Sequence, residues 1–436
     1  MRTASPAAPD RGRRRAPPSL FLSPVAAKRA VRSRVMAARA SVSTQQVGGR
    51  QWWGARRECV RGRRGPHGRR QTPHPLPRAS ADAVTTVARW RTRNARKIAS
   101  APRGGARAPL LDPPLFAQTS VADSKFADYK PTTAFFFPGQ GAQTVGMAAD
   151  VCAAVPAAKA LFDTASEILG YDLLSVCVNG PKDKLDTTAV SQPAIYVSSL
   201  AAVEKLRAES GQAALDAVDV AAGLSLGEYT ALTFAGALTF EDGLKLVKLR
   251  GESMQAAADA APSAMVSVIG LDAAKTAELC EAATAEVGAA DGVRIANFLC
   301  SGNYAVSGGV AGCDAVERLA KSFGARMCVR LAVAGAFHTA YMAPAEAALR
   351  AALAATPVSV PRIPVVSNVD AAPHADPAVI KDILARQLTS PVQWEATLKT
   401  LLDRGLAKSY EVGPNKVIAG IMKRTDKKHA IENVTV

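Results

Sequence analysis

The pentapeptide Gly223-Leu224-Ser225-Leu226-Gly227 is the feature that most constrains what this chain can fold into. An apolar run at Ala217–Ala222 predicts a buried strand before it, and a helical pattern begins at Glu228 after it. A G-x-S-x-G sequence between a strand and a helix is typical of a nucleophile elbow, whose glycines allow a tight turn that holds the serine at the end of the sheet. The same pentapeptide also occurs in ordinary turns, but the flanking strand and helix favour a nucleophile.

Strands and helices alternate along most of the chain, which predicts an α/β fold with a parallel sheet core. Strands are expected at Thr133–Phe137, Ala217–Ala222, Ile363–Val366 and Lys408–Glu411. Helices are expected at Val151–Leu169, Pro193–Glu209, Phe240–Ala257, Ala343–Ala354, Pro377–Leu388, Trp394–Leu402 and Lys416–Arg424, besides the one from Glu228. Pro193 fits the first turn of its helix, and Asp376 is an expected N-cap.

The middle of the chain follows a different order, βαββαβ, which is typical of a ferredoxin-like unit. Its strands are expected at Ala264–Gly270, Val293–Phe298, Tyr304–Ser307 and Arg326–Val333, and its helices at Ala273–Val287 and Ala311–Phe323. We therefore expect a small ferredoxin-like subdomain at 259–335. It would be inserted into a large α/β domain formed by 130–258 and 336–425.

The positive charge of the chain is concentrated before the predicted fold. Residues 1–110 hold 26 Lys and Arg against 3 acidic residues, whereas 111–436 hold 28 against 34. A nucleic-acid-binding protein needs its positive charge on the folded domain, so we expect no nucleic-acid partner. The composition of 1–115, rich in Arg, Ser, Ala and Pro, is typical of an organelle transit peptide or of a disordered basic tail.

The remaining composition excludes several other classes of protein. No run approaches the 18 or more apolar residues of a membrane span, so no membrane partner is expected. The seven cysteines are scattered without a C-x-x-C pair, which argues against a disulfide framework or a zinc site and for a reducing compartment.

A nucleophilic serine needs a base, and histidine is the usual one. Of the five histidines, His67 and His74 lie in the basic leader. His374 lies in a loop and His429 in a basic segment near the end, and both are expected to be exposed to solvent. His338 lies where the last strand of the small subdomain returns to the large domain. Elimination favours His338 as the base, although a histidine at such a junction is often structural.

Arg250 offers a separate indication. At 100° per residue along its helix, Arg250 points away from the polar stripe that holds Lys245 and Lys248, towards the side of Leu246 and Ala257. A buried guanidinium is costly without an anionic partner. That partner is either a carboxylate of this protein or a carboxylate of a ligand, to which the planar guanidinium can bind in a bidentate manner.

Two other classes of function fit parts of this pattern. An esterase or thioesterase of the α/β-hydrolase type would need an acid between the serine and the histidine in chain order. It would also need an HGGG-type motif, and the sequence contains no HGGG. It would also leave Arg250 unexplained. A non-catalytic binding module on the same fold would have no reason to keep Ser225, His338 and Arg250 together.

Several motifs together resemble the malonyl-CoA:acyl carrier protein transacylases and the acyltransferase domains of fatty-acid and polyketide synthases. In chain order they are Phe137-Pro138-Gly139-Gln140-Gly141-Ala142-Gln143, Gly223-Leu224-Ser225-Leu226-Gly227-Glu228-Tyr229, Leu249-Arg250-Gly251, Gly335-Ala336-Phe337-His338, Pro391-Val392-Gln393-Trp394 and Glu411-Val412-Gly413-Pro414. The resemblance covers roughly residues 130–425. It implies a large α/β-hydrolase-like domain with an inserted ferredoxin-like subdomain.

The resemblance also implies a role for each matching residue. Ser225 would be the acylated nucleophile and His338 its base. The backbone N–H groups of Gln140 and Leu226 would form the oxyanion hole. The main-chain carbonyl of Gln387 would orient the histidine in place of a triad aspartate.

The acyl pocket is implied in the same way. Arg250 would bind the malonyl carboxylate, Asn297 would line the pocket, and Phe337 would leave little room for a 2-methyl branch. Two positions depart from the common pattern. Leu224 stands where many bacterial members have histidine, which bears on pocket contacts and not on the general base. Asn415 replaces a usual glycine and bears on loop shape.

The implied reaction transfers malonyl from malonyl-CoA to holo-acyl carrier protein through a malonyl-serine, supplying type II fatty acid synthesis. It needs no metal and no other cofactor, and we expect a monomer. Leu224 and the segment Phe126–Pro131 resemble the plant and algal enzymes, which favours a plastid location, with the mitochondrial matrix as the alternative.

Overall fold

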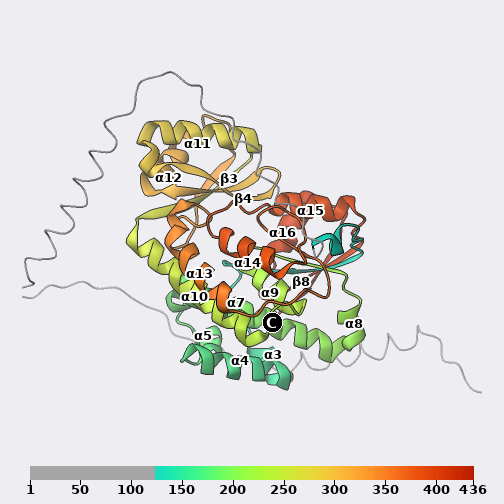
Figure 1. Ribbon diagram of the computed structural model, residues 1–436. Helices are drawn as coiled ribbons and strands as arrows, with labels where there is room; N and C mark the ends of the chain where they lie inside the picture. The colour runs from blue at the N-terminus through green and yellow to red at the C-terminus, as the bar shows by residue number, and fades with distance from the viewer. Residues whose placement is uncertain (1–122) are drawn as a thin grey trace, which may run out of the picture. The chain divides into compact units, whose positions relative to one another are not determined.

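The structure, a computed structural model, describes residues 123–436 (Figure 1). The predicted leader, 1–115, lies outside the described residues, as do His67 and His74. The domain boundaries at 130–258, 259–335 and 336–425 stay predictions.

A five-stranded parallel sheet forms the centre of the larger part of the fold. Its strands follow the order β7-β2-β1-β8-β9, and every neighbouring pair is parallel. The strands are β1 (Thr133–Phe137), β2 (Val220–Gly223), β7 (Val365–Val366), β8 (Lys408–Val412) and β9 (Ile431–Val434). The sheet confirms the predicted parallel core, and β1 begins and ends as expected.

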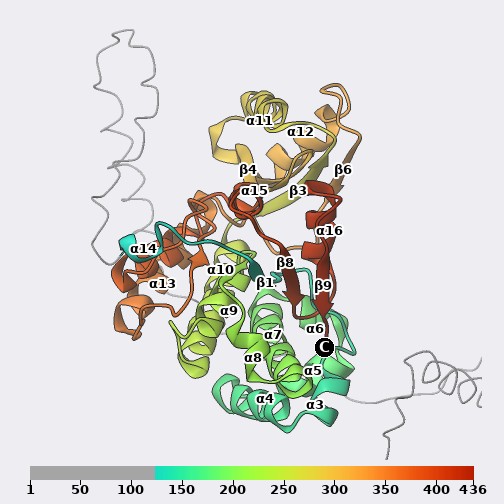
Figure 2. The same cartoon turned by 90° about the vertical axis from the view of Figure 1, so that its right-hand side faces the viewer.

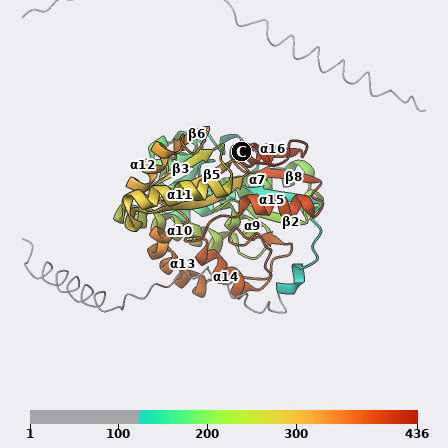
Figure 3. The same cartoon turned by 90° about the horizontal axis from the view of Figure 1, so that it is seen from above.

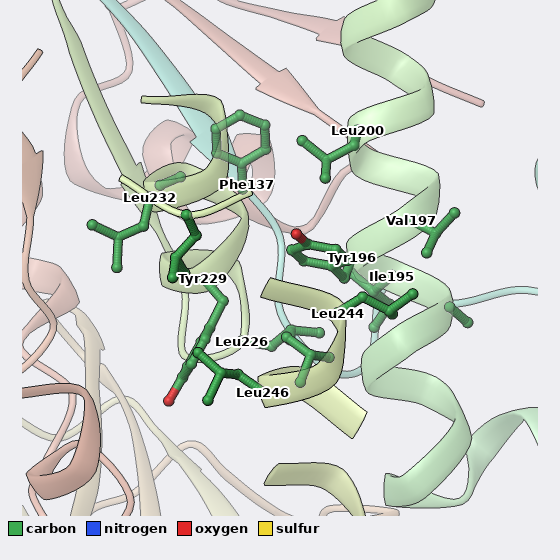
Figure 4. Close-up of a cluster of buried hydrophobic side chains, with 14 of the residues drawn as sticks. Phe137, Ile195, Tyr196, Val197, Leu200, Leu226, Tyr229, Leu232, Leu244 and Leu246 are labelled. Atoms are coloured by element: carbon green, nitrogen blue, oxygen red, sulfur yellow. The ribbon is translucent and has the colours of Figure 1, made fainter. Parts of the chain in front are cut away.

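Alternation along β1 divides the core between the two faces of this sheet. Phe135 and Phe137 belong to a buried cluster with residues of α4 (Pro156–Leu169), α7 (Thr188–Ser210), α9 (Gly227–Phe234) and α10 (Phe240–Ala260). Ala134 and Phe136 belong to a second cluster, in which the Phe136 ring packs edge-on against Trp394 of α15 (Trp394–Asp403). Figure 4 shows part of the first cluster, where side chains of α7 and α10 meet Phe137 and the helix after the nucleophile turn.

The helices of this part surround the sheet (Figures 1 and 2). They are α3 (Ala149–Ala154), α4 (Pro156–Leu169), α5 (Leu173–Asn179), α6 (Lys182–Asp186), α7 (Thr188–Ser210), α8 (Gln212–Asp216), α9 (Gly227–Phe234), α10 (Phe240–Ala260), α13 (Ala343–Ala355), α14 (Pro377–Arg386), α15 (Trp394–Asp403) and α16 (Val417–Thr425). Asp376 caps α14 as predicted, because its carboxylate accepts from the backbone N–H of Ala378.

The smaller part contains the predicted βαββαβ order. Its elements are β3 (Ser263–Ile269), α11 (Ala273–Val287), β4 (Val293–Cys300), β5 (Asn303–Gly309), α12 (Val310–Leu319) and β6 (Met327–Arg330). The strands form an antiparallel sheet in the order β4-β5-β3-β6. Helices α11 and α12 pack on one face of it, as the view in Figure 3 shows.

Two predictions at the level of elements were wrong, and one strand was not predicted. Pro193 lies inside α7, which begins at Thr188, and not in its first turn. Burial of every residue from Ser191 to Val203 supports the helix despite the missing N–H. The helix expected over Val151–Leu169 is broken at Val155, whose backbone is extended because Pro156 disfavours the helical conformation before it. Strand β9, which follows a basic segment, was not predicted from the sequence.

Candidate active site

The nucleophile turn connects β2 to α9. Ser225 adopts a left-handed backbone conformation, with φ of 51°, which is costly for a residue with a side chain and is often found at functional sites. A Cβ atom on Gly223 would lie 1.9 Å from the carbonyl carbon of Gly227, and one on Gly227 would lie 2.1 Å from the carbonyl oxygen of Phe137. Both positions therefore require glycine, and the predicted elbow is present.

The imidazole of His338 lies between the serine and a main-chain carbonyl. Its Nε2 is 3.0 Å from Ser225 Oγ, and its Nδ1 is 2.8 Å from the carbonyl oxygen of Gln387. Because a carbonyl oxygen only accepts, Nδ1 carries the proton and Nε2 is left to accept from the serine hydroxyl. Burial, together with the charge of Arg250, lowers the pKa of His338 to about 4, so the imidazole is neutral near pH 7.

Arg250 extends from α10 towards the same hydroxyl and is only 1% exposed. Its Nη1 donates to Gln192 Oε1 at 2.7 Å, and its Nη2 donates to Gln387 Oε1 at 2.9 Å and to Ser225 Oγ at 3.0 Å. No carboxylate within 123–436 forms an ion pair with it, and its Nε has no partner there. Of the two partners left open by the sequence, a carboxylate of these residues therefore makes no direct ion pair with Arg250, although burial lowers the pKa of the guanidinium and the nearby charge of Glu228 acts to raise it.

A cavity of about 270 Å³ opens over Ser225. The predicted site residues Gln140, Leu226, Asn297 and Phe337 all line it. Among the described residues, no atom accepts a hydrogen bond from the backbone N–H of Gln140 or of Leu226. Both N–H groups are therefore available to bind a ligand in the cavity. The rest of the wall is mainly apolar and is formed by Leu224, Met254, Met265, Leu299, Ala305, Leu331, Val333, Val417 and Ile421, with Gly139, Arg250 and His338.

Comparison with known proteins shows the family to which this chain is related. The acyl transferase domain family matches residues 134–436. A malonyl CoA-acyl carrier protein transacylase of Bacillus subtilis is 39% identical over 295 residues, covering 68% of this chain and 90% of the relative. The chain belongs to the malonyl-CoA:acyl carrier protein transacylase family.

Two further relatives support the assignment to this family. A mitochondrial malonyl-CoA-acyl carrier protein transacylase of Homo sapiens is 39% identical, covering 66% of this chain and 75% of the relative. The solved structure of a malonyl CoA-acyl carrier protein transacylase from Coxiella burnetii is similar to this one with a TM-score of 0.66. It is 35% identical and covers 70% of this chain and 94% of its own. These similarities confirm the predicted fold class.

Sequence reasoning missed the polar side chains behind the site of this family member. Gln192 and the side-chain amide of Gln387 both accept from Arg250. Asn368 accepts from the backbone N–H of Ser225 at 2.6 Å, and Glu228 accepts from the side chain of Gln387 at 2.8 Å. Glu228 follows directly after the elbow, so its position in the sequence could have indicated a residue near the nucleophile. The other three come from distant parts of the sequence and carry no local pattern.

The other described histidines are less exposed than predicted. His374 is half-buried, and its Nε2 lies 2.9 Å from a carboxylate oxygen of Asp370. His429 is also half-buried, and its Nε2 lies 2.9 Å from the hydroxyl of Ser409. Local hydrogen bonds explain both positions, and neither residue lines the cavity over Ser225.

Two other features bear on the class of site. Within 123–436 no three His, Cys, Asp or Glu side chains are grouped as metal ligands. The helices of the same residues include none with the length and apolar character needed to span a membrane.

Proposed function

We propose that this chain transfers the malonyl group of malonyl-CoA to the phosphopantetheine thiol of holo-acyl carrier protein. The observation that carries the proposal is the position of Ser225 Oγ, 3.0 Å from His338 Nε2 and 3.0 Å from Arg250 Nη2. One hydroxyl therefore meets a neutral base and a buried guanidinium without a carboxylate partner. That combination suits an acyl group with a free carboxylate.

The first half of the reaction forms a malonyl-serine. Ser225 Oγ attacks the thioester carbon while its proton moves to His338 Nε2. The oxyanion that develops is stabilised by the backbone N–H groups of Gln140 and Leu226, the second of which lies at the start of α9. When the C–S bond breaks, the coenzyme A sulfur takes the proton from His338.

The second half transfers the group to the carrier. The phosphopantetheine thiol gives its proton to His338 and attacks the malonyl ester carbon. The bond to Ser225 Oγ breaks, and the oxygen takes the proton back. The cavity is lined by residues of β3, β4 and β5 of the small sheet and by residues that follow β1 and β2 of the large sheet, and this enclosure should limit the access of water to the malonyl-serine.

Intact-mass measurement after exposure to malonyl-CoA tests the nucleophile. We expect one malonyl group, mapped to Ser225, and its loss in Ser225→Ala. Addition of holo-carrier should then yield malonyl-carrier. Free malonate as the main product would favour the hydrolase class, and undiminished carrier malonylation by Ser225→Ala would overturn the mechanism.

Arg250 is proposed to bind the malonyl carboxylate in place of part of its present contacts. Arg250→Ala should then weaken malonyl transfer by about 2–4 kcal/mol in transition-state free energy, because a buried charge-assisted pair is lost. Acetyl transfer should fall much less. Equal losses for the two acyl groups would contradict the assigned role.

Phe337 and Asn297 are proposed to shape the acyl pocket. Phe337 is 5% exposed and lies directly before the base, so its ring limits the space beside the malonyl C2. A smaller residue, as in Phe337→Ser, should raise methylmalonyl transfer relative to malonyl transfer in a competition assay. An unchanged product ratio would remove the residue from the selectivity.

An acidic carrier is proposed to dock near α16. The basic residues of this region are all exposed, and the same helix provides Val417 and Ile421 to the cavity wall. They are Lys416, Lys423, Arg424, Lys427 and Lys428. Charge reversal at Lys423 and Arg424 should raise KM for the carrier and leave KM for malonyl-CoA unchanged.

We also propose that the chain is a monomer, which light scattering would test.

The proposed location is the plastid, in support of type II fatty acid synthesis. The support is the basic composition of the leader and the plant-like residues Leu224 and Phe126–Pro131. A mitochondrial relative favours the alternative, the mitochondrial matrix. Import of the full chain into isolated chloroplasts and isolated mitochondria would decide between them.

A further inference from the structure

Glu228 is a buried acidic residue that the proposed reaction does not use. It lies on α9, three residues after the nucleophile, and is 3% exposed. Its Oε2 accepts from the backbone N–H of Asn368 at 3.0 Å and from Gln387 Nε2 at 2.8 Å. Burial raises the pKa of its carboxyl to about 7, so holding an acid here carries a cost.

Glu228 belongs to a hydrogen-bond network with two branches, one through Gln387 and one through Asn368. The first branch sets the orientation of the Gln387 amide. Gln387 Oε1 accepts from Arg250 Nη2 at 2.9 Å, and Gln387 Nε2 donates to the carbonyl oxygen of Ser225 at 3.1 Å and to Glu228. A guanidinium only donates and a carbonyl oxygen only accepts, so a single orientation of the amide satisfies all three contacts. The opposite orientation would place like atoms against each other at every one of them.

The other branch holds the nucleophile turn itself. Asn368 Oδ1 accepts from the backbone N–H of Ser225 at 2.6 Å, and Asn368 Nδ2 donates to the carbonyl oxygen of Gly223 at 2.7 Å. The backbone N–H of Asn368 is bound by Glu228. Oε2 of Glu228 therefore links Asn368, which holds the Ser225 turn, to Gln387, which contacts Arg250.

Gln387 also connects Glu228 to the base, His338. Its main-chain carbonyl accepts from His338 Nδ1 at 2.8 Å. A displacement of Gln387 would therefore reach the imidazole, the guanidinium and the serine backbone together. Such networks are sensitive, because a partly satisfied buried polar group is costlier than a fully satisfied one.

We propose that Glu228 is a positioning residue, which through the Gln387 amide and Asn368 holds the Arg250 guanidinium beside Ser225 in the orientation that accepts a carboxylate-bearing acyl group. The inference rests on the proposed malonyl transfer and assigns Glu228 a part in its selectivity. A residue that only stabilised the start of α9 would alter stability and leave selectivity unchanged.

The test compares malonyl and acetyl transfer by the full-length chain. In Glu228→Met both acceptor contacts are lost, so kcat/KM for malonyl transfer should fall by about tenfold or more, and more than for acetyl transfer, because small misplacements at a site are amplified. In Glu228→Gln the amide oxygen can accept from the same two N–H groups, so malonyl transfer should return to within about threefold of the wild type. Glu228→Asp keeps the carboxyl group but shortens its reach, so its malonyl transfer should be intermediate.

Glu411 provides a matched control. It is also fully buried, and it accepts from the backbone N–H groups of Ile418 and Ala419 at 2.9 and 2.8 Å, with no contact to Gln387 or Arg250. Glu411→Gln should lower the unfolding temperature and leave the malonyl-to-acetyl ratio of kcat/KM unchanged.

The outcomes separate this inference from the function on which it rests. A wild-type chain that fails to malonylate the carrier would overturn both. A wild-type chain that is active, with an unchanged malonyl-to-acetyl ratio in folded Glu228→Met, would overturn the role of Glu228 alone. If Glu228→Met does not fold, Glu228→Asp carries the test, and an unchanged ratio there has the same meaning. An equal change of the ratio in Glu411→Gln would also overturn it.

Discussion

His338 and Arg250 approach Ser225 from different sides, and each affects the chemistry of the other. The buried imidazole has a low pKa first because burial disfavours its charged form and next because the arginine charge repels a proton. A neutral imidazole can accept the serine proton across the whole physiological range. The low pKa also weakens it as a base, and the contact with the Gln387 carbonyl, which raises its pKa, opposes that loss.

Removal of the arginine charge should therefore shift the pH dependence of acylation. In Arg250→Met the pKa of His338 should rise from about 4 towards its ordinary 6.5, because one of the two main causes of its depression is gone. The acidic limb of the rate profile, measured with acetyl-CoA so that no carboxylate is needed, should move to higher pH. Lys423→Met, at an exposed position, is the control. A limb that stays in place or moves to lower pH would contradict the coupling.

Glu228 makes a second prediction at this scale, for stability. Its pKa is raised from 4.5 to about 7 in the folded chain. Between these pH values, the carboxyl keeps its proton in the folded state and loses it in the unfolded state. The stability of the wild type should therefore fall as pH rises from about 4.5 to 7, by on the order of 3 kcal/mol. Glu228→Gln should lack this loss. Urea unfolding of both proteins at pH 5 and pH 8 measures it, and a pH-independent difference between them would be the contrary result.

At the scale of elements, β2 and α9 meet so closely that their glycines leave no room for a methyl group. Gly227→Ala places a Cβ 2.1 Å from the carbonyl oxygen of Phe137, so it should lower the free energy of unfolding by about 3 kcal/mol or more and reduce acylation. Gly420, in α16, has no atom within 4 Å of an added Cβ, and Gly420→Ala should stabilise by about 0.4–1 kcal/mol. Denaturant unfolding of the pair provides the comparison, and similar effects at both positions would argue against steric exclusion.

Elements with strong local patterns could be predicted from the sequence. Helix α11 and strand β1 have the expected bounds because their apolar periods and end signals are local. The α7 helix was predicted to start too late, because the burial that supports Pro193 in its interior is tertiary. In the same way the elbow pattern indicated Ser225, whereas the Asn368 contact to its backbone joins residues 143 positions apart, which only the folded sheet brings together.

At the scale of the whole described unit, the small sheet contacts connecting segments of the larger part, including the one that carries the base. Val392, in the segment after α14, pairs with the edge of β4, since its N–H donates to the carbonyl of Ala296 and its carbonyl accepts from Phe298. Arg294, also on β4, donates to the main-chain carbonyls of His338 and Thr389. The small sheet therefore helps to hold the segment that carries the base, and closure of the cavity depends on contacts between the two parts.

Arg294→Met should test that dependence. The backbone pairing of β4 with Val392 remains, so both sheets should stay folded, but His338 loses a charge-assisted contact to its carbonyl, worth about 1–3 kcal/mol when intact. The base segment should then be looser, and water should reach the malonyl-serine more often. We expect more free malonate relative to malonyl-carrier, by about threefold or more, measured by separating the two products. Arg330→Met removes the same charge from the opposite edge of the same sheet, where Arg330 pairs with Glu317. That variant should partition as the wild type does, and an unchanged partition in Arg294→Met would show that the small sheet encloses the site without controlling access to it.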